Sequence, residues 1–275
     1  MIGNKKLSII LIVLNILACI FVAFPIIYAI LGSFMPPPQL SQGMGANLIP
    51  WSFHWKNYTD AFAAVPLFGF IVNSFFISIA QMILQLIVGS LAAYAFAMFD
   101  FRGKKFAFMV VISTMMIPFQ SIVLANFQTI TALGLIDTPW AIIVPSIASA
   151  FTIFNLRQSF ASQPKELKEA ADIDGCRDFR FLWQITIPIN RPILSSCAII
   201  AFILSWNDYL WPLLVTNSIE RRTLQIGVSM MRNAMISNYG PILAAGVIAL
   251  VPSLTEFIIC QRQLISGLAA GAVKG

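Results

Sequence analysis

The stretch Glu169-Ala170-Ala171-Asp172-Ile173-Asp174-Gly175, followed ten residues later by Ile185-Thr186-Ile187-Pro188, decides how the rest of the chain is interpreted. It lies in the segment 157–191, which holds six of the 17 Lys and Arg residues, and long uncharged runs flank it on both sides. We interpret it as a cytoplasmic docking helix. The flanking runs are then membrane helices that convert a push on that helix into opening and closing of a path.

The local pattern predicts a helix over residues 165–174. Ser162 is a candidate N-cap, Pro164 suits the first turn, and Gly175 suits a C-terminal cap with positive φ. Leu167, Ala170, Ala171 and Asp174 follow i, i+3, i+4, i+7 spacing and predict one small, shallow face. A helix of about 12 residues is marginal alone in water, so it needs a surface to pack on. That surface is either a partner or the protein's own inner surface.

The residues after the helix leave the secondary structure open. Phe179, Phe181, Trp183, Ile185 and Ile187 alternate with other residues as in a strand. Phe179, Leu182 and Trp183 also fit a helical face, and helix is preferred because nothing nearby offers a sheet partner.

Composition identifies an integral membrane protein. Of the 275 residues, 59% are hydrophobic and 10% are charged, whereas a soluble chain carries about 25% charged residues. The net charge of +6 does not indicate nucleic acid binding, because the basic residues lie between apolar spans rather than on one face.

The sequence contains no phosphate-binding loop motif, so any ATP would be bound by another chain. The four cysteines and the single histidine predict no metal site and no disulfide.

Uncharged runs long enough to cross a bilayer predict an all-α fold with six transmembrane helices. The predicted spans cover residues 7–31, 73–98, 106–127, 140–160, 192–215 and 240–265. With the N-terminus inside, 13 of the 17 Lys and Arg residues fall on the inner side, which places both termini in the cytoplasm. Residues 1–275 then form a single domain, with a cytoplasmic coupling loop at 162–190 between the fourth and fifth spans.

Gly89, Ala93 and Ala97 form a small-residue stripe, either for internal packing or for a subunit contact.

The loop resembles the signature loop of bacterial ABC-importer permeases, which has E-A-A, three further residues, G, nine further residues, and then I-x-hydrophobic-P. The chain supplies it at Glu169-Ala170-Ala171, Gly175 and Ile185 to Pro188, with Cys176 and Ile187 as small departures. Further segments look like the carbohydrate branch, in particular the maltose transporter's smaller permease, so the similarity covers nearly the whole chain. These segments are Asn73-Ser74, Ala93-Tyr94-Ala95-Phe96-Ala97, Ile117-Pro118, Gly134-Leu135-Ile136, Trp206-Asn207-Asp208 and Gly271-Ala272-Val273-Lys274-Gly275.

The resemblance implies a non-catalytic permease subunit of a sugar importer in a bacterial plasma membrane. Its partners would be a second permease, two ATPase subunits that bind ATP and Mg²⁺, an extracytoplasmic solute-binding protein and membrane lipid, with no nucleic acid. The chain itself would hold no cofactor. The implied ATPase-coupling residues are Leu167, Glu169, Ala170, Ala171, Asp174, Gly175, Ala272, Val273 and Lys274.

Polar residues within apolar spans are expensive and mark candidate substrate contacts. The candidates are Asn73, Asn126, Asn155, Trp206, Asn207, Asp208 and Tyr209. Aromatic rings beside an amide and a carboxylate suit a sugar, but Trp and Tyr also gather at the membrane interface without any ligand.

Three other functions compete with sugar import. Import of glycerol phosphate or a polyol would belong to the same branch. A stand-alone secondary carrier would need charge pairs or proton relays within its spans, and only Asp208 and Glu256 are acidic residues near a span. A membrane enzyme would need catalytic clusters, and none is recognisable. The loop signature favours the permease.

Overall fold

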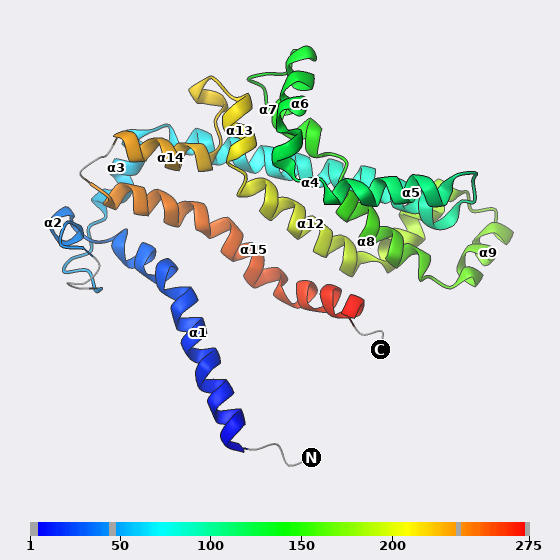
Figure 1. The fold of residues 1–275 in the computed structure, drawn as a ribbon, viewed down its shortest axis with the longest axis horizontal. Coiled ribbons are helices and arrows are strands. Elements are labelled where there is room, and N and C mark those ends of the chain that lie inside the picture. Colours follow the sequence, from blue (N-terminus) through cyan, green and yellow to red (C-terminus); the bar gives the residue numbers. More distant parts are fainter. Residues whose placement is uncertain (1–4, 44–47, 235–237, 273–275) are drawn as a thin grey trace. The chain divides into compact units, whose positions relative to one another are not determined.

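The computed structural model describes residues 5–43, 48–234 and 238–272, with the side chains of 10–43, 48–232 and 238–259. Every regular element in these ranges is a helix (Figure 1). The long helices are α1 (Lys5–Gly32), α4 (Leu67–Met98), α12 (Arg191–Trp206) and α15 (Gly240–Ala272). The helices of intermediate length are α3 (Lys56–Ala64), α5 (Lys104–Ser113), α6 (Phe119–Ala132), α8 (Ala150–Ala161), α9 (Lys165–Ile173) and α14 (Leu224–Ala234). The short elements are α2 (Pro37–Leu40), η1 (Thr114–Met116), α7 (Pro139–Ile143), η2 (Val144–Ser146), α10 (Asp178–Phe181), the π-helical turn η3 (Leu182–Thr186), α11 (Ile187–Ile189), α13 (Leu210–Val215) and η4 (Ile219–Arg221).

The chain divides into two compact units. The first comprises residues 1–68 and 227–252. Here the segment after α1 is fastened by the buried amide of Asn57, whose Nδ2 donates to the carbonyl oxygens of Ser33 and Met35, each at 2.9 Å. The ring of Phe34 packs on Trp55 and Tyr58 at centroid distances of 4.9 and 5.3 Å. This aromatic cluster closes the connection between α1 and α3.

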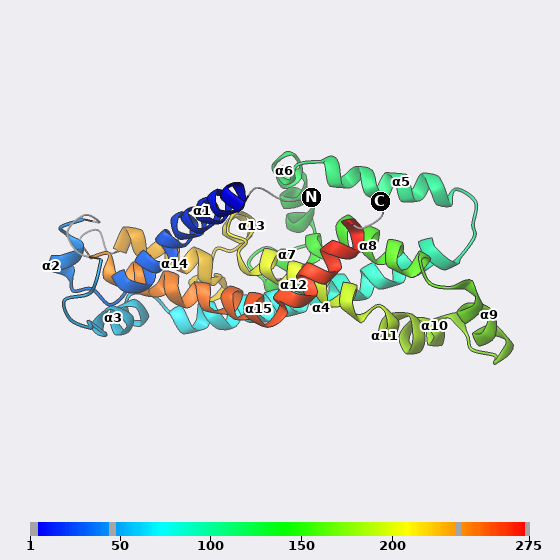
Figure 2. The ribbon, with the colours of Figure 1, turned by 90° about the horizontal axis from the view of Figure 1, so that it is seen from below.

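The second unit, residues 69–226 and 253–275, has two hydrophobic clusters along α4. Towards the start of α4, Ile77 packs with residues of α6, α7 and α13, including Trp211 and Val215. Towards its end, Ala93 and Tyr94 pack with α8, α9, α10, η3 and α12. Figures 1 and 2 both show α9 beyond this second end of α4.

Three helical segments in the described part of the chain are long and apolar enough to cross a membrane without a break. They are Ile10–Gly32, Leu67–Met98 and Gly240–Ile259. Three further spans form only if each bent helix pair counts as one. These pairs are Lys104–Met116 with Phe119–Ala132, bent by 105°, Pro139–Ser146 with Ala150–Ala161, bent by 45°, and Asp178–Ile189 with Arg191–Trp206, bent by 85°. The first span is continuous through Pro25.

The predicted third, fourth and fifth spans are therefore wrong as single helices. Ile117 is extended because the helical region is disfavoured for a residue before a proline, and Pro118, also extended, is the N-cap of α6. In the fourth span, Ser149 is extended and its hydroxyl caps α8 by accepting from the Thr152 N–H at 3.3 Å. In the fifth, α12 ends at Trp206 and α13 begins separately at Leu210.

The small-residue stripe of α4 packs inside this chain. A Cβ added to Gly89 would lie 2.8 Å from Cγ2 of Thr152 in α8. The Thr152 hydroxyl accepts a hydrogen bond from Nε2 of the buried Gln85 at 2.7 Å. Ala93 is fully buried in the same contact region. Gly89 therefore allows α4 and α8 to approach closely, as the internal-packing interpretation requires.

We predict that Gly89→Ala lowers the thermal midpoint of the purified protein in detergent. The new methyl group would displace Thr152 and strain its bond to Gln85, at a cost of about 1–3 kcal/mol. Gly69→Ala is the matched control in the same helix, because a Cβ there meets open space. The control should be neutral or stabilising by up to about 1 kcal/mol. Equal midpoints for the two variants would contradict the close approach.

Candidate functional site

Helix α9, the predicted coupling helix, begins later than its predicted cap. Pro164 is the N-cap, with an extended backbone, and its carbonyl oxygen accepts from the Leu167 N–H at 3.3 Å. Ser162 ends the preceding helix α8, and its hydroxyl donates to the Ser159 carbonyl at 2.8 Å. The predicted N-cap role of Ser162 and first-turn role of Pro164 are therefore wrong. The two residues belong to a tight turn between two helices.

The C-terminal end of α9 is a complete Schellman motif. Gly175 has φ of +70°, as predicted from its position. Its N–H donates to the Asp172 carbonyl at 3.0 Å, and the Cys176 N–H donates to the Ala171 carbonyl at 2.8 Å. These bonds satisfy two of the carbonyl groups that a helix end leaves free, and they fix the direction in which the chain departs.

The two faces of α9 have different surroundings. Leu167, Glu169, Ala170 and Asp174 are exposed, and Ile173 is 87% exposed. Ala171 is only 6% exposed and packs in the cluster that contains Tyr94 and Phe181. The predicted common face of Leu167, Ala170, Ala171 and Asp174 is therefore divided, with Ala171 facing its own chain. Ile173, which the spacing argument left out, is the most exposed large apolar side chain of the helix.

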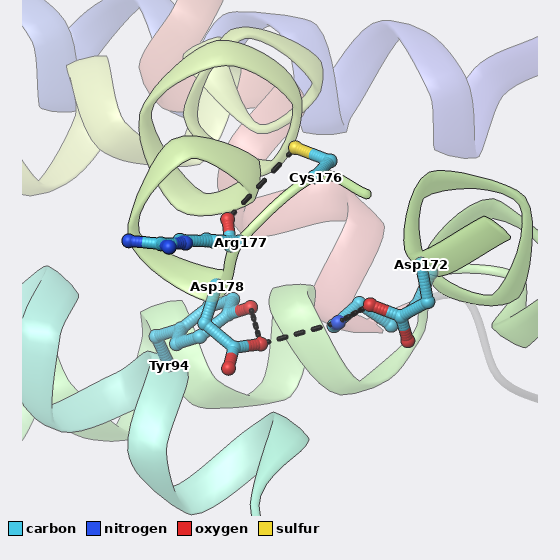
Figure 3. Close-up of polar contacts among 6 residues, drawn as sticks. Tyr94, Asp172, Cys176, Arg177 and Asp178 are labelled. Carbon is cyan, nitrogen blue, oxygen red and sulfur yellow. Dashed lines mark hydrogen bonds and ion pairs between the residues drawn. The ribbon is translucent and has the colours of Figure 1, made fainter. Parts of the chain in front are cut away.

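Lys168 fastens the inner face of α9 to its neighbours. Its ammonium group pairs with the carboxylates of Asp172 and Asp178, at 3.2 Å in the case of Asp178. It also lies over the ring of Phe181, at 5.5 Å from the centroid. The Tyr94 hydroxyl of α4 donates to Asp178 at 3.2 Å, as Figure 3 shows. One cation thus joins α9 to α10, and through Asp178 to the end of α4.

The ion pairs raise the pKa of Lys168 above its ordinary value. The largest cause of the raised pKa is the hydrogen bond to Asp172. Desolvation lowers the pKa, and the hydrogen bond to Asp178 raises it by a smaller amount. Lys168 therefore stays positively charged at neutral pH. Sequence reasoning missed this residue because a lysine on a short polar helix usually faces solvent. The only available signal was its i, i+4 spacing to Asp172.

The segment after α9 is helical, which confirms the preferred interpretation of residues 179–188. It consists of α10, the π-turn η3 and α11. Asn190 ends this segment, and its side chain accepts from the Ser159 hydroxyl at 2.5 Å and donates to the Thr186 carbonyl at 2.7 Å. The segment after α9 is thus also tied to α8. Of the predicted tail contacts, Val273, Lys274 and the side chain of Ala272 lie outside the described residues.

The candidate substrate residues separate into structural and exposed groups. Trp206 is 1% exposed and packs on Phe75 at a centroid distance of 4.7 Å. The Asp208 carboxylate accepts backbone N–H groups of Tyr209, Leu210 and Trp211, so it caps α13. Both residues therefore have a role in holding the fold.

Two of the remaining candidates are exposed. Asn207 is exposed, and its Nδ2 donates to the Ile203 carbonyl of its own helix at 2.9 Å. Tyr209 is 40% exposed. Asn126 and Asn155 are half-buried, and Asn155 bonds within its own helix to the Phe151 carbonyl at 2.8 Å.

Asn73 holds a distant loop. Its Nδ2 donates to the carbonyl oxygens of Glu220 and Arg222 at 2.7 and 3.0 Å. Phe75, two residues after Asn73 in α4, contacts Trp206, whereas Asn126 and Asn155 lie on other helices, α6 and α8.

Residues 85–265 match the family described as binding-protein-dependent transport system inner membrane component. The chain is 38% identical over 255 residues to the arabinooligosaccharides transport system permease protein of Halalkalibacterium halodurans, covering 92% of this chain and 91% of the relative. It is 32% identical over 278 residues to the sn-glycerol-3-phosphate transport system permease protein of Agrobacterium fabrum, covering 98% of each. The fold matches a chain of a bacterial ABC transporter involved in the import of alginate, with a TM-score of 0.85, 22% identity and coverage of 95% and 98%.

We predict that Lys168→Met loosens α9 while Lys165→Met does not. Lys168 pairs with two carboxylates, whereas Lys165 is exposed at the start of the same helix. These ion pairs are partly exposed, so the loss is about 0.5–1 kcal/mol. Hydrogen exchange of peptides covering residues 165–176 should accelerate a few-fold in Lys168→Met. Unchanged exchange in that variant would show that the ion pairs do not hold the helix.

Proposed function

The chain belongs to the family of binding-protein-dependent transport system inner membrane components, and from this premise we propose that it is a permease subunit of an ATP-driven sugar importer. It is a multi-pass membrane protein in which residues 1–275 serve as one transmembrane domain in a bacterial plasma membrane.

For the topology, we propose six spans with both termini in the cytoplasm. The three unbroken apolar helices and three bent pairs are compatible with this number. The inner side would then carry 13 of the 17 Lys and Arg residues. Under this topology α9 lies in the cytoplasm, and the loop between α13 and α14 lies outside.

The exposed face of α9 carries the functional proposal. Ile173 is 87% exposed and lies one helical turn after the exposed small residue Ala170. An apolar side chain next to a shallow surface suits insertion into a cleft of another protein. We propose that a separate ATPase provides this cleft, with Leu167, Glu169, Ala170, Ile173 and Asp174 as the contact residues. Ala171 and Gly175 would support the helix from within.

ATP and Mg²⁺ would be bound by two such ATPase subunits, because this sequence has no phosphate-binding loop motif. A second, homologous permease would complete the path, and an extracytoplasmic solute-binding protein would deliver the substrate. Closure of the ATPase pair would push α9 and rock the permeases between inward-facing and outward-facing states. The tail residues Ala272, Val273 and Lys274 are proposed to reach the ATPase interface as well.

The substrate is proposed to be a disaccharide or oligosaccharide. The relative that transports arabinooligosaccharides supports this, and the glycerol-3-phosphate relative supports the alternative within the same branch. Asn207 and Tyr209 are the best candidates for direct contact because both are exposed at the break between α12 and α13. Asn126 and Asn155 remain candidates on α6 and α8.

Isolation of the intact complex tests the proposal. The tagged chain, extracted from membranes in mild detergent, should co-purify with an ATPase, a second permease and a solute-binding protein. The ATPase activity should rise when the binding protein carries its sugar. Recovery of the chain alone, with transport that needs no ATP, would instead indicate a stand-alone carrier. Screening the binding protein against sugars, glycerol phosphates and polyols would identify the substrate.

We predict that Gly175→Val uncouples ATP hydrolysis from uptake. A β-branched residue at φ of +70° costs roughly 1–2 kcal/mol and weakens the end of α9. Gly103→Val is the matched control, because Gly103 has φ of +82° and a Cβ there also meets open space. Both variants should reach the membrane. Only Gly175→Val should lower the sugar transported per ATP hydrolysed, and equal ratios would contradict the role of α9.

We predict that Asn207→Ala changes uptake without changing assembly. Its control is Asn15→Ala, because the Asn15 amide also bonds only four residues back in its own helix, at 2.8 Å. Uptake of the radiolabelled substrate should fall several-fold for Asn207→Ala, since a lost hydrogen bond to a sugar costs about 0.5–1.5 kcal/mol. Equal rates for both variants would remove Asn207 from the path.

A further inference from the structure

The segment between α13 and α14 is short and unusually well fastened. Residues 216–223 contain the single turn η4, Ile219–Arg221, in which Ile219 is 46% exposed and Glu220 and Arg221 are also exposed. Side chains from two other parts of the second unit bind its backbone. These side chains belong to Asp137 and Asn73.

Asp137 holds the first half of the loop. Its carboxylate accepts the Asn217 and Ser218 N–H groups at 2.8 and 2.9 Å and also the Ser218 hydroxyl. The Asp137 N–H donates to the Val215 carbonyl at 2.8 Å. Asp137 has φ of +64°, a conformation that costs energy for most side chains and that Asp tolerates better. Hydrogen bonds from Ser218 lower the pKa of Asp137, so its carboxylate stays ionised at neutral pH.

Asn73 and Ser74, near the start of α4, hold the second half. The Asn73 amide donates to the carbonyl oxygens of Glu220 and Arg222, on either side of Arg221. The Ser74 hydroxyl accepts the Leu224 N–H at 2.8 Å. These bonds go to backbone atoms, so they fix the shape of the loop whatever its own side chains are.

The base of this arrangement is rigid. Trp211 in α13 is 2% exposed, and its Nε1 donates to the Ala141 carbonyl in α7 at 3.0 Å. Val215, the last residue of α13, is fully buried in the same cluster. The turn that carries Asp137 leads directly into α7. The loop is therefore held between two packed elements and the start of α4.

Such a loop has already lost its conformational freedom before any partner arrives. Ordering the backbone of one residue costs about 1–2 kcal/mol of free energy. A loop that becomes ordered only on binding therefore has a binding free energy that is less favourable by the cost of ordering its residues. A loop held by bonds to its backbone, with three exposed side chains at its tip, has the form of a preorganised docking element.

We infer that Asn73 and Asp137 are positioning residues that hold Ile219, Glu220 and Arg221 ready to dock with the extracytoplasmic binding protein. The inference rests on the proposed function and its topology, which place this loop outside. It reassigns Asn73 from a substrate contact to a support for the docking loop.

The test combines hydrogen exchange with docking kinetics on the purified complex. Asp137→Gly removes the carboxylate without straining the positive φ, and Asp137→Asn keeps one acceptor and the same backbone preference. Exchange of peptides covering residues 214–226 should accelerate at least about ten-fold in Asp137→Gly and less in Asp137→Asn. Asn73→Ala should accelerate exchange in the same peptides, and the helices should be unaffected.

The docking readout is the binding-protein concentration that gives half-maximal ATPase stimulation. This concentration should rise about ten-fold in Asp137→Gly and Asn73→Ala, while the maximal ATPase rate stays the same. Asp137→Asn should restore most of the affinity. Asp60→Asn removes a carboxylate from another segment proposed to lie outside and should change neither quantity.

The two possible failures differ. If the unmodified complex is not stimulated by any binding protein, the proposed function fails. If the unmodified complex is stimulated, but Asp137→Gly and Asn73→Ala dock as tightly as it does, the positioning inference is overturned. A fall in maximal rate with unchanged half-saturation would also overturn it, because that pattern indicates a general structural role.

Discussion

The second unit depends on α4 being one unbroken helix of membrane length. Asn73 and Tyr94 are 21 residues apart in it, which corresponds to about 32 Å along a helix, close to the roughly 30 Å of a bilayer's hydrocarbon core. Asn73 binds the loop between α13 and α14, and Tyr94 binds Asp178 next to α9. The same rigid element therefore supports both of the loops to which partner proteins are proposed to bind.

Packing around α4 follows from the lack of a hydrophobic force between helices in lipid. Association then relies on close contact and on hydrogen bonds between helices. Gly89 supplies the close contact with α8, and Gln85 bonds to Thr152 across it. Gln81 accepts from the Ser205 hydroxyl of α12 at 3.1 Å. A polar stripe on an apolar helix thus fixes the positions of two neighbouring helices.

Local backbone rules were readable from the sequence, whereas contacts between distant segments were not. The positive φ of Gly175 followed from its place after a helical pattern. The break at Pro118 was not foreseen, because apolar composition continues across it and sets only the length of a span, not its straightness. The inward position of Ala171 depends on Tyr94, which lies far earlier in the sequence, and on Phe181, which lies after α9 in α10. Asp137 gave no signal, since a turn aspartate is common and its partners lie about 80 residues later.

The fastening of α9 determines how the proposed push of an ATPase on it would be transmitted. Its C-terminal cap and the bonds of Lys168 make α9 and α10 one stiff element, so the cap between them is a poor hinge. From there one route runs through Asp178 and Tyr94 into α4, and another through Asn190 and Ser159 into α8. The chain itself continues into α12 at a bend of 85°, beside Asn190. Since α4, α8 and α12 pack together in the cluster around Ala93, displacement of α9 would move the three helices as a group rather than bend one of them.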